Sequence, residues 1–279
     1  MMIKILPSLI LLHSASAFVQ TARTKTSTTR LFGWGPEPIW DVAEVVSVAP
    51  EPNHQGCVSV VLNVGDEKAP TYSIPGQYCQ VKECSDDAKP AFLAVASPPS
   101  EDSNHWEFLI KRTENNGWIC DAAVGTKLDV SQILGQGFQM KENFEGFKFD
   151  FPTQQVLMFA AGSGIAPIRA AIESGQLNIG KGRGARLYYG CRSFNEMAYA
   201  DRFQQWEQLG VQVVPVLSQE AELAQPFRGG YVQTALEEDG VPIPRNCGAL
   251  ICGMKGMAEA VTELLKKSGM FEGRILTNF

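Results

Sequence analysis

A short glycine-rich segment holds the clearest chemical signal in this sequence. It reads Gly162-Ser163-Gly164-Ile165-Ala166-Pro167 and directly follows the continuous apolar run 156–161. Glycine allows a sharp turn and a close approach of a ligand to the backbone, and a helix tolerates proline in its first turn. Free N–H groups at a helix start attract phosphate. The segment therefore predicts a site for the diphosphate of a dinucleotide; the alternative is a tight strand-to-helix connection that binds nothing.

Thiols and imidazoles offer little other chemistry. The seven cysteines include no CxxC pair, which argues against a disulfide framework, a zinc site or an iron–sulfur cluster. Three histidines are too few for a histidine-based triad or metal centre, so no metal site is expected. Cys252 lies at the end of an apolar run and is followed by Gly253 and Met254. By its type alone, such a cysteine is a small buried residue at a strand end.

Composition and charge exclude further classes of protein. The chain has 279 residues, of which 44% are hydrophobic and 19% charged, as in ordinary globular proteins. This length fits one large domain or two ordinary ones. The formal net charge of −6 argues against a nucleic-acid-binding protein, which usually carries a basic face.

The first 36 residues have the composition of a removable presequence. Residues 1–17 predict a signal peptide, with Lys4 as its basic start, an apolar stretch at 5–12 and Ala-Ser-Ala at 15–17 as the cleavage pattern. Residues 18–36 are basic, rich in Thr and Ser and free of acidic residues, as in a transit peptide. The apolar stretch is too short to span a bilayer, so we expect no transmembrane segment in the mature chain. Together the two parts resemble the bipartite plastid presequence of diatoms and related algae; simple secretion is the alternative.

The segment 37–150 predicts an antiparallel barrel. Its short runs are rich in Val, Ile and aromatic residues and are separated by Pro, Gly, Asn or Asp, as in β-strands. The expected strands are 41–48, 57–64, 72–81, 91–96, 106–111 and 127–130, with one short helix at 118–124 after Gly117. Six short strands favour a closed barrel, because closure removes exposed edges.

From 151 to 279 the pattern changes, and strands alternate with helices. The expected strands are 156–161, 186–189, 211–217, 249–252 and 274–279. The expected helices are 167–174, 232–238, 257–267 and one whose face carries Tyr199, Phe203 and Trp206. Such alternation predicts a parallel sheet wrapped by helices. We therefore expect two domains with a boundary near residue 151.

The order of these features resembles the ferredoxin–NADP reductase superfamily. A barrel is followed by GSGIAP at 162–167, by Tyr-Gly-Cys-Arg at 189–192, by Cys-Gly at 252–253 and by a final aromatic strand. The resemblance covers residues 39–279 and looks closest to a plant and algal plastid branch known as fruit proteins. It implies an antiparallel six-stranded flavin-binding β-barrel (37–150), followed by an α/β parallel-sheet nucleotide-binding domain (151–279).

The resemblance assigns roles to particular residues of the second domain. Members of the superfamily hold FAD or FMN on the barrel and NAD(P)H on the second domain, and hydride passes between them. The dinucleotide diphosphate would be held by Gly162, Ser163, Gly164, Ile165 and Pro167. Cys252, with Gly253 and Met254, would lie beside the nicotinamide, and Phe279 would cover one face of the flavin. Packing alone is the alternative for both Cys252 and Phe279.

A further pair of residues bears on the choice of coenzyme. Ser218 and Gln219 stand where members that prefer NADPH often have Ser-Arg, and Glu220 and Glu222 follow. Gln brings no positive charge to a 2′-phosphate, which favours NADH. Arg192 or Arg202 could compensate.

The flavin motifs depart most from the superfamily. The RxYS motif aligns with Ala-Phe-Leu-Ala at 91–94, so its arginine and tyrosine become apolar, and GxxS becomes Gly-Trp-Ile-Cys at 117–120. A basic pair at 111–112 is kept, or is a solvated strand end. Loss of one charged phosphate contact costs about 1.5–3 kcal/mol, so flavin binding can survive in weaker form. The flavin contacts that the resemblance implies are Leu93, Ala94, Val95, Ser97, Lys111, Gly117 and Cys120.

Taken together, the motifs predict a flavin-dependent NAD(P)H oxidoreductase that moves hydride between nicotinamide and flavin and then passes electrons to an acceptor. No motif identifies that acceptor, a small molecule or a redox protein, and the acidic chain disfavours an acidic ferredoxin. Two alternatives stay open. The chain could be an NAD(P)-binding protein that has lost tight flavin binding and acts as a sensor, or it could be a structural subunit.

Overall fold

The computed structural model describes residues 37–279 apart from 147, 181, 221–226 and 279. The described residues belong to one compact unit that begins at Glu37. The predicted presequence, Glu222 and Phe279 lie outside the described residues.

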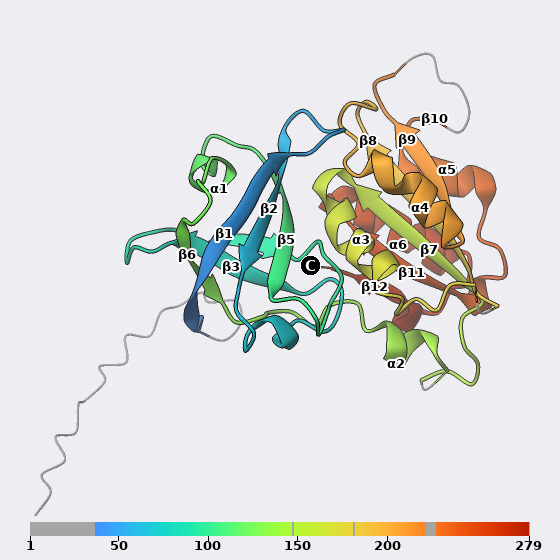
Figure 1. Cartoon of the computed structure of the whole chain (residues 1–279). Helices are drawn as coiled ribbons and strands as arrows, with labels where there is room; N and C mark the ends of the chain where they lie inside the picture. The colour runs from blue at the N-terminus through green and yellow to red at the C-terminus, as the bar shows by residue number, and fades with distance from the viewer. Residues whose placement is uncertain (1–36, 147, 181, 221–226, 279) are drawn as a thin grey trace, which may run out of the picture. The chain divides into compact units, whose positions relative to one another are not determined.

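The first half of this unit is an antiparallel sheet of six strands (Figure 1). Neighbouring strands follow the order β4-β3-β6-β1-β2-β5. The two outer strands approach each other, and the amide of Ala96 just after β4 donates a hydrogen bond to the carbonyl of Glu107 on β5 at 2.7 Å. The sheet is therefore a nearly closed barrel, as predicted. Its strands are β1 (Trp40–Pro50), β2 (Cys57–Asn63), β3 (Tyr78–Glu83), β4 (Ala91–Ala94), β5 (His105–Lys111) and β6 (Lys127–Ser131).

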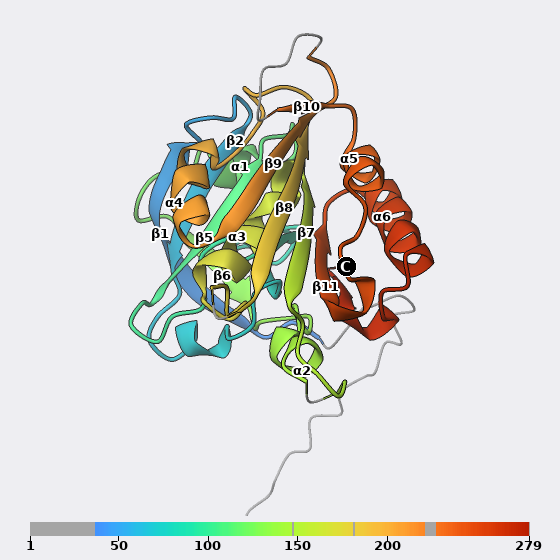
Figure 2. The same cartoon turned by 90° about the vertical axis from the view of Figure 1, so that its right-hand side faces the viewer.

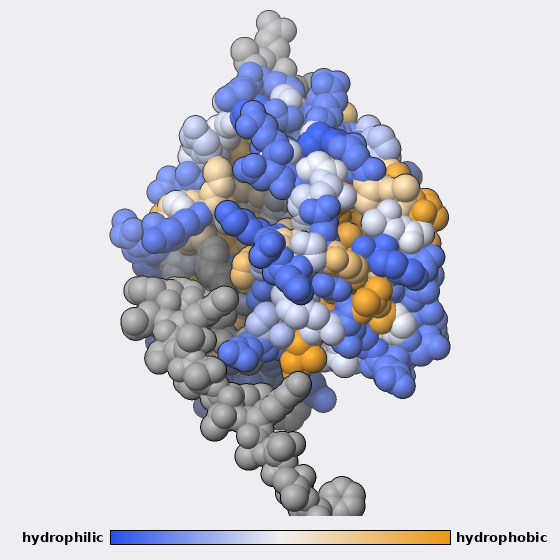
Figure 3. All heavy atoms as spheres, turned by 90° about the vertical axis from the view of Figure 1, so that its left-hand side faces the viewer, coloured by the Kyte–Doolittle hydropathy of each residue, from blue (hydrophilic) through white to orange (hydrophobic). Residues whose placement is uncertain are grey.

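Because side chains alternate along β5, this strand packs into the barrel core on one side and against the second half of the chain on the other. Trp106, Phe108 and Ile110 point inward and lie in the apolar core of the barrel. Glu107 and Leu109 point outward, since successive side chains of a strand face opposite sides, and both contact the second half of the chain. Seen from the barrel side, the surface is mostly polar, with apolar residues in small separate patches (Figure 3).

Two predicted bounds in the barrel were wrong. The strand expected at 72–81 begins only at Tyr78, because Pro75 and Gly76 form a bend in which Gly76 has a φ of +93°. A 3-10 turn, η1 (Ala69–Thr71), precedes that bend. The helix expected at 118–124 is the single turn α1 (Gly117–Cys120).

The second half is a parallel sheet with the strand order β10-β9-β8-β7-β11-β12. Helices α3 (Ile165–Glu173) and α4 (Phe203–Gln208) cover one face, and α5 (Val232–Asp239) and α6 (Lys255–Lys267) cover the other (Figure 2). Burial on both faces explains why the strands are continuously apolar. The strands are β7 (Gln155–Ala161), β8 (Gly184–Cys191), β9 (Val211–Leu217), β10 (Arg228–Gly229), β11 (Cys247–Cys252) and β12 (Ile275–Thr277).

Some elements of this half differ from the prediction. Tyr199 is not on a helix with Phe203 and Trp206: it has a left-handed backbone (φ +60°) and precedes η3 (Ala200–Arg202). The last strand is shorter than 274–279, because Arg274 belongs to the turn η5 (Glu272–Arg274). The two-residue strand β10 was not predicted, because so short a segment carries no periodicity.

The two halves share one apolar core. Ala96 and Leu109 of the barrel lie in the same cluster of buried residues as Ile165 and Ala166 of α3. Helix α2 (Met140–Phe144) joins that cluster through Met140 and Phe144, although the boundary expected at residue 151 placed it with the barrel. None of the described helices has the length and apolar character needed to cross a membrane.

Candidate functional site

The parallel sheet has a crevice where its strand order reverses. From β7 the chain moves outward through β8 to β9, and it later returns to place β11 on the other side of β7. In open α/β sheets, ligands bind at the carboxyl ends of the strands at this switch point. The segments that follow β7 and β11 are the turn η2 (Gly162–Gly164) and residues 252–254. The two predicted nucleotide motifs therefore meet at one point.

The two motifs touch backbone to backbone. A Cβ atom on Gly164 would lie 2.4 Å from the carbonyl oxygen of Cys252 and 2.8 Å from the Cα of Gly253. A Cβ on Gly253, which has a φ of +152°, would lie 2.9 Å from the backbone nitrogen of Ala161. Gly164 is therefore needed for the close approach of the two turns, rather than for the approach of a ligand as the sequence suggested.

There is free space for a Cβ atom at Gly162, whereas there is none at Gly164. It has a φ of +53°, and a Cβ on it would meet no atom within 4 Å. Ser163 is exposed, and the nine-residue helix α3 follows directly. The amide of Ile165 donates back to the carbonyls of Gly162 and Ser163, and Pro167 has no N–H, so the turn itself rather than the first residues of α3 offers amides to the crevice. An open glycine cradle before a helix N-terminus fits a diphosphate. Ile165 and Pro167 are buried and support the turn from beneath.

Cys252 lies beside this cradle as a neutral thiol. Burial raises its pKa to about 11, although a hydrogen bond from Asn278 acts in the opposite direction. The Nδ2 of Asn278 lies 3.9 Å from the Cys252 Sγ. Met254 follows, and its side chain is 67% exposed. At neutral pH this thiol can pack and orient a ligand, and it does not exchange a proton.

The carboxyl ends of β8 and β9 bring the predicted coenzyme-selecting residues together. The amides of Ser218 and Gln219 donate to the carbonyls of Cys191 and Arg192 at 3.0 and 2.9 Å. The Arg192 guanidinium is already paired with Glu196 (2.9 Å). A carboxylate oxygen of Glu220 accepts the amide of Phe194 at 2.6 Å. A ligand here meets neutral and acidic groups and one engaged cation.

On the barrel, the predicted flavin contacts lie on the short strand β4 and just beyond it. Leu93 is half-buried and packs against the barrel core, whereas its neighbour Phe92 is 62% exposed. Ala94 is half-buried and Val95 fully buried. The Ser97 hydroxyl accepts the amide of Glu107 at 3.1 Å, so it helps to close the barrel. This strand offers a ligand backbone groups and apolar surface, and no charge.

Near α1, Arg112 is paired with a carboxylate, whereas Lys111 is exposed. Arg112 makes two hydrogen bonds to the carboxylate of Asp121 (2.6 and 2.8 Å). Lys111 is exposed and lies on the same face of β5 as Glu107 and Leu109. The Cys120 thiol lies 3.5 Å from the side-chain oxygen of Asn116, the residue before Gly117. For a phosphate, Lys111 is thus the cation that remains available among the predicted contacts.

Comparison with known proteins agrees with this arrangement. The chain is 32% identical to fruit protein pKIWI502 of Actinidia deliciosa, over 95% of this chain and 82% of that protein. It belongs to the ferredoxin reductase-like superfamily of FAD- and NAD-binding proteins. The family model described as an oxidoreductase NAD-binding domain matches residues 158–263, which include both turns of the crevice.

Two further comparisons show a more distant sequence similarity and a shared fold. The chain is 26% identical to one subunit of the Na(+)-translocating NADH-quinone reductase of Psychrobacter arcticus over 66% of this chain, but it matches only 43% of that longer protein. The structure of a ferredoxin NADP+ reductase from Neisseria gonorrhoeae with bound FAD and NADP superposes with a TM-score of 0.69 at 16% identity, covering 86% of this chain and 99% of that chain. The two-domain superfamily fold predicted from the sequence is confirmed.

The contact surface between the two halves, which is called the seam, contains a cluster of charged side chains that the sequence did not predict. Glu107 of β5 pairs with Arg169 of α3 through two short hydrogen bonds, and strand β5 contacts the turn η2. Little in the sequence indicates this pair, since each residue is a charge among the mostly apolar residues of its strand or helix. Among the described residues, no three His, Cys, Asp or Glu side chains form a group that could hold a metal ion.

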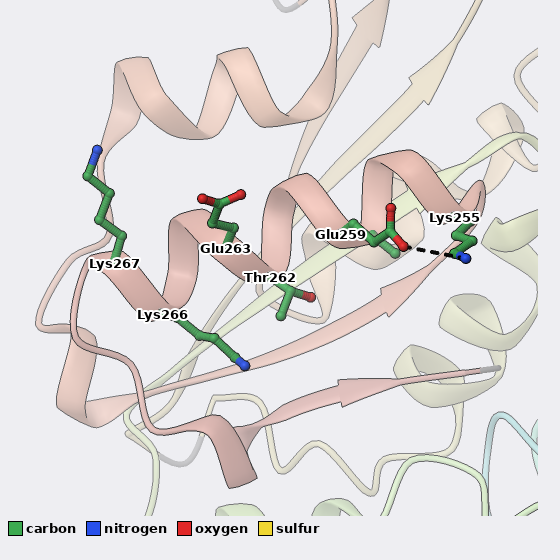
Figure 4. A pocket seen from close by; sticks show the side chains of 7 residues that line it. Lys255, Glu259, Thr262, Glu263, Lys266 and Lys267 are labelled. Atoms are coloured by element: carbon green, nitrogen blue, oxygen red, sulfur yellow. Dashed lines mark ion pairs between the residues drawn. The ribbon is translucent and has the colours of Figure 1, made fainter.

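A separate hollow of about 1030 Å³ runs along α6 (Figure 4). Its described lining is mostly charged, and Lys255 pairs with Glu259 at 3.6 Å along the helix. None of the predicted site residues is among its described lining, so it is separate from the crevice. The described lining residues are Lys255, Ala258, Glu259, Thr262, Glu263, Lys266 and Lys267.

Proposed function

We propose that this protein is a flavin-dependent NAD(P)H oxidoreductase that transfers hydride between a nicotinamide and a flavin held on the barrel. The observation that carries the proposal is the packing of the Gly162–Gly164 turn, through Gly164, against the Cys252 turn, at the switch point of the sheet and next to barrel strand β5. This arrangement would place a nicotinamide at the seam between the two halves. When bound, flavin supplies the chemistry that accepts hydride and releases electrons to a further acceptor.

The residues of the crevice would bind and orient rather than move protons. The N–H groups of Gly162 and Ser163, with the positive end of the α3 dipole behind them, would hold the diphosphate. The contact between Gly164 and Cys252 fixes the thiol relative to that diphosphate. A neutral thiol presents a compact surface to the nicotinamide ring, and hydride transfer depends mainly on such positioning.

The barrel would hold the flavin with fewer charges than is usual in the superfamily. Lys111 and the amides at the start of α1 would face its phosphate, while the half-buried Leu93 and Ala94 would offer backbone and apolar contacts to its rings. The side chain of Val95 is buried in the barrel core and would support them from beneath. The Arg112–Asp121 pair withdraws a second cation from this task. Binding of flavin is therefore expected to be weaker by about ten- to a hundredfold, the equivalent of one charged hydrogen bond. Either FAD or FMN fits this description.

The crevice favours NADH over NADPH. Gln219 brings no charge, Arg192 is paired with Glu196, and Glu220 lies two residues beyond Ser218 in the segment that follows β9. A 2′-phosphate would be repelled by the acidic groups here, whereas the uncharged 2′-hydroxyl of NADH would not.

The test is made on the purified protein. We expect a yellow colour, absorbance near about 450 nm as for flavoproteins, and bleaching under anaerobic conditions on addition of NADH. Chromatography of the released cofactor separates FAD from FMN, and titration with each coenzyme gives the preference. Protein that stays colourless after incubation with both flavins and binds neither coenzyme would refute the proposal.

One observation favours a second candidate, an NAD(P)-binding protein without tight flavin binding. Strand β4 is apolar and its Leu93 packs against the barrel core, and Arg112 is already paired with Asp121. This candidate predicts coenzyme binding by titration calorimetry without retained flavin. A structural subunit would bind neither.

We further propose that residues 1–36 direct the protein to a plastid. The support is the pairing of a signal peptide with a basic segment rich in Thr and Ser. A fluorescent protein fused after residue 36 should accumulate in plastids of a diatom. Secretion of the fusion would support the alternative.

A further inference from the structure

A buried and a partly buried charge join the barrel to the nucleotide half. The side chain of Arg169 is 4% exposed and that of Glu107 is 20% exposed. Their contact is bidentate, with Nη1 to Oε1 at 2.5 Å and Nη2 to Oε2 at 2.8 Å. Burial alone would raise the pKa of Glu107, but the hydrogen bonds and charge of Arg169 outweigh it and the pKa lies below its usual value. Both groups are therefore charged at neutral pH.

Arg169 is held rigidly on its own side of the seam. Its Nε donates to Glu173 at 3.1 Å, and its guanidinium lies 4.6 Å from the ring centre of Tyr199. Glu173 also accepts hydrogen bonds from Arg202 and from the Trp206 indole, both at 3.1 Å. A planar guanidinium fixed at its edge and face can meet a carboxylate in only one orientation.

Glu107 is equally fixed, and it is bonded to the residues just after β4, at 96–97, which are called the rim of the barrel. Its carboxylate also accepts the Ser59 hydroxyl at 3.1 Å. Its backbone amide donates to the Ser97 hydroxyl, and its carbonyl accepts the amide of Ala96, so the residues just after β4 are bonded to Glu107 itself. The ion pair thus connects the segment that follows β4 directly to α3, the helix that begins at the Gly162–Gly164 turn.

We propose that the Glu107–Arg169 pair is a positioning element that sets the distance and orientation of the glycine turn relative to the rim of the barrel. This inference rests on the proposed function, because what it positions is the nicotinamide against the flavin. Neither residue touches the reacting atoms.

The apolar part of the seam cannot do this alone. Ala96 and Leu109 pack against residues of α3, but apolar contact has no direction and tolerates sliding. Two parallel charge-assisted hydrogen bonds add geometric specificity. Hydride transfer is sensitive to such geometry, and a displacement of about 1 Å can slow a reaction about a hundredfold.

The experiment compares variants of the full-length, flavin-loaded protein by anaerobic stopped-flow reduction, which yields a limiting rate and a coenzyme dissociation constant separately. Glu107→Asp keeps the charge and shortens the side chain, and Glu107→Gln removes the charge. If the single charge left on Arg169 prevents folding, the double variant Glu107→Gln/Arg169→Gln removes both charges. Asp239→Asn is the matched control, because Asp239 is a carboxylate of similar exposure (16%) that pairs with Arg186 within the nucleotide half alone.

We expect the Glu107 variants to lower the limiting rate by about ten- to a hundredfold with less than about a threefold change in the dissociation constant. Asp239→Asn should change the limiting rate by less than about twofold, even where it lowers the melting temperature as much. A second readout is hydrogen exchange at the amide of Gln55, which donates to Asn195 across the seam at 3.2 Å, far along the chain from Glu107. Faster exchange there in the Glu107 variants supports a loosened seam.

Different failures have different meanings. An active wild-type protein whose Glu107 variants match the Asp239 control in rate and in Gln55 exchange overturns this inference alone. Glu107 variants that lose coenzyme affinity without losing the limiting rate also overturn it. A wild-type protein that binds neither flavin nor coenzyme overturns the proposed function and this inference with it.

Discussion

Replacement of Gly164 by alanine tests the central contact of the crevice. The new Cβ would lie 2.4 Å from the Cys252 carbonyl oxygen, whereas ordinary contact begins at 3.4 Å, so the two turns must separate by about 1 Å. The obstructing atoms are backbone and cannot swing aside. Overpacking of this kind costs about 1–3 kcal/mol, and we expect the upper end of that range. The same displacement moves Cys252 away from the nicotinamide and should slow flavin reduction about a hundredfold.

The assay for Gly164→Ala pairs urea unfolding with anaerobic stopped-flow reduction. Gly256→Ala is the control, since a Cβ there meets no atom within 4 Å and its backbone suits any residue. That control should be as stable as the wild type or slightly more so, because alanine is the better helix former. A Gly164→Ala protein with wild-type stability and wild-type reduction rate would refute the argument that this glycine serves the contact of the two turns.

Three further predictions follow from buried groups. Cys252→Ala should slow reduction more than it weakens coenzyme binding, and equal losses in rate and affinity would indicate packing alone. Because burial raises the pKa of Cys252 to about 11, the wild-type rate should show no thiol ionisation between about pH 6 and 9. Burial lowers the pKa of His54 below 6.5, so the folded state disfavours its protonation, and the free energy of unfolding should fall as pH drops through about 6.5; His54→Gln should flatten that limb in urea titrations. Arg274 is fully buried against Phe149 and Phe151 and donates to the Arg245 carbonyl at 2.9 Å. Arg274→Met should therefore destabilise the protein by about 2–4 kcal/mol. An unchanged urea midpoint would contradict this.

Local patterns were enough to predict the architecture of both halves. The run 156–161 is apolar at every buried position because α3 and α6 cover its two faces, and the glycines after it mark the turn. Short runs rich in Val, Ile and aromatic residues, bounded by Pro, Gly, Asn or Asp, identified the barrel in the same way. These signals are carried by neighbouring residues, so the sequence displays them directly.

Features that depend on distant partners were out of reach. Glu107 and Arg169 stand 62 residues apart, and nothing near either of them indicates the other. Tyr199 has helical spacing to Phe203, yet its left-handed backbone stops the helix short of it. The reason for Gly164 was also hidden, because the atoms that exclude a side chain there belong to Cys252 and Gly253.

The common apolar cluster has a consequence for how such chains can be recombined. Ala96 and Leu109 are buried in one cluster with residues of α3, and Phe144 belongs to the same cluster although it precedes the parallel sheet in the chain. A chimera that joined this nucleotide half to a homologue's barrel at residue 151 would leave those surfaces mismatched. Gene shuffling within this lineage should therefore have exchanged the segment around residues 138–144 together with the second half, and alignments of natural fusions should show their junctions ahead of it.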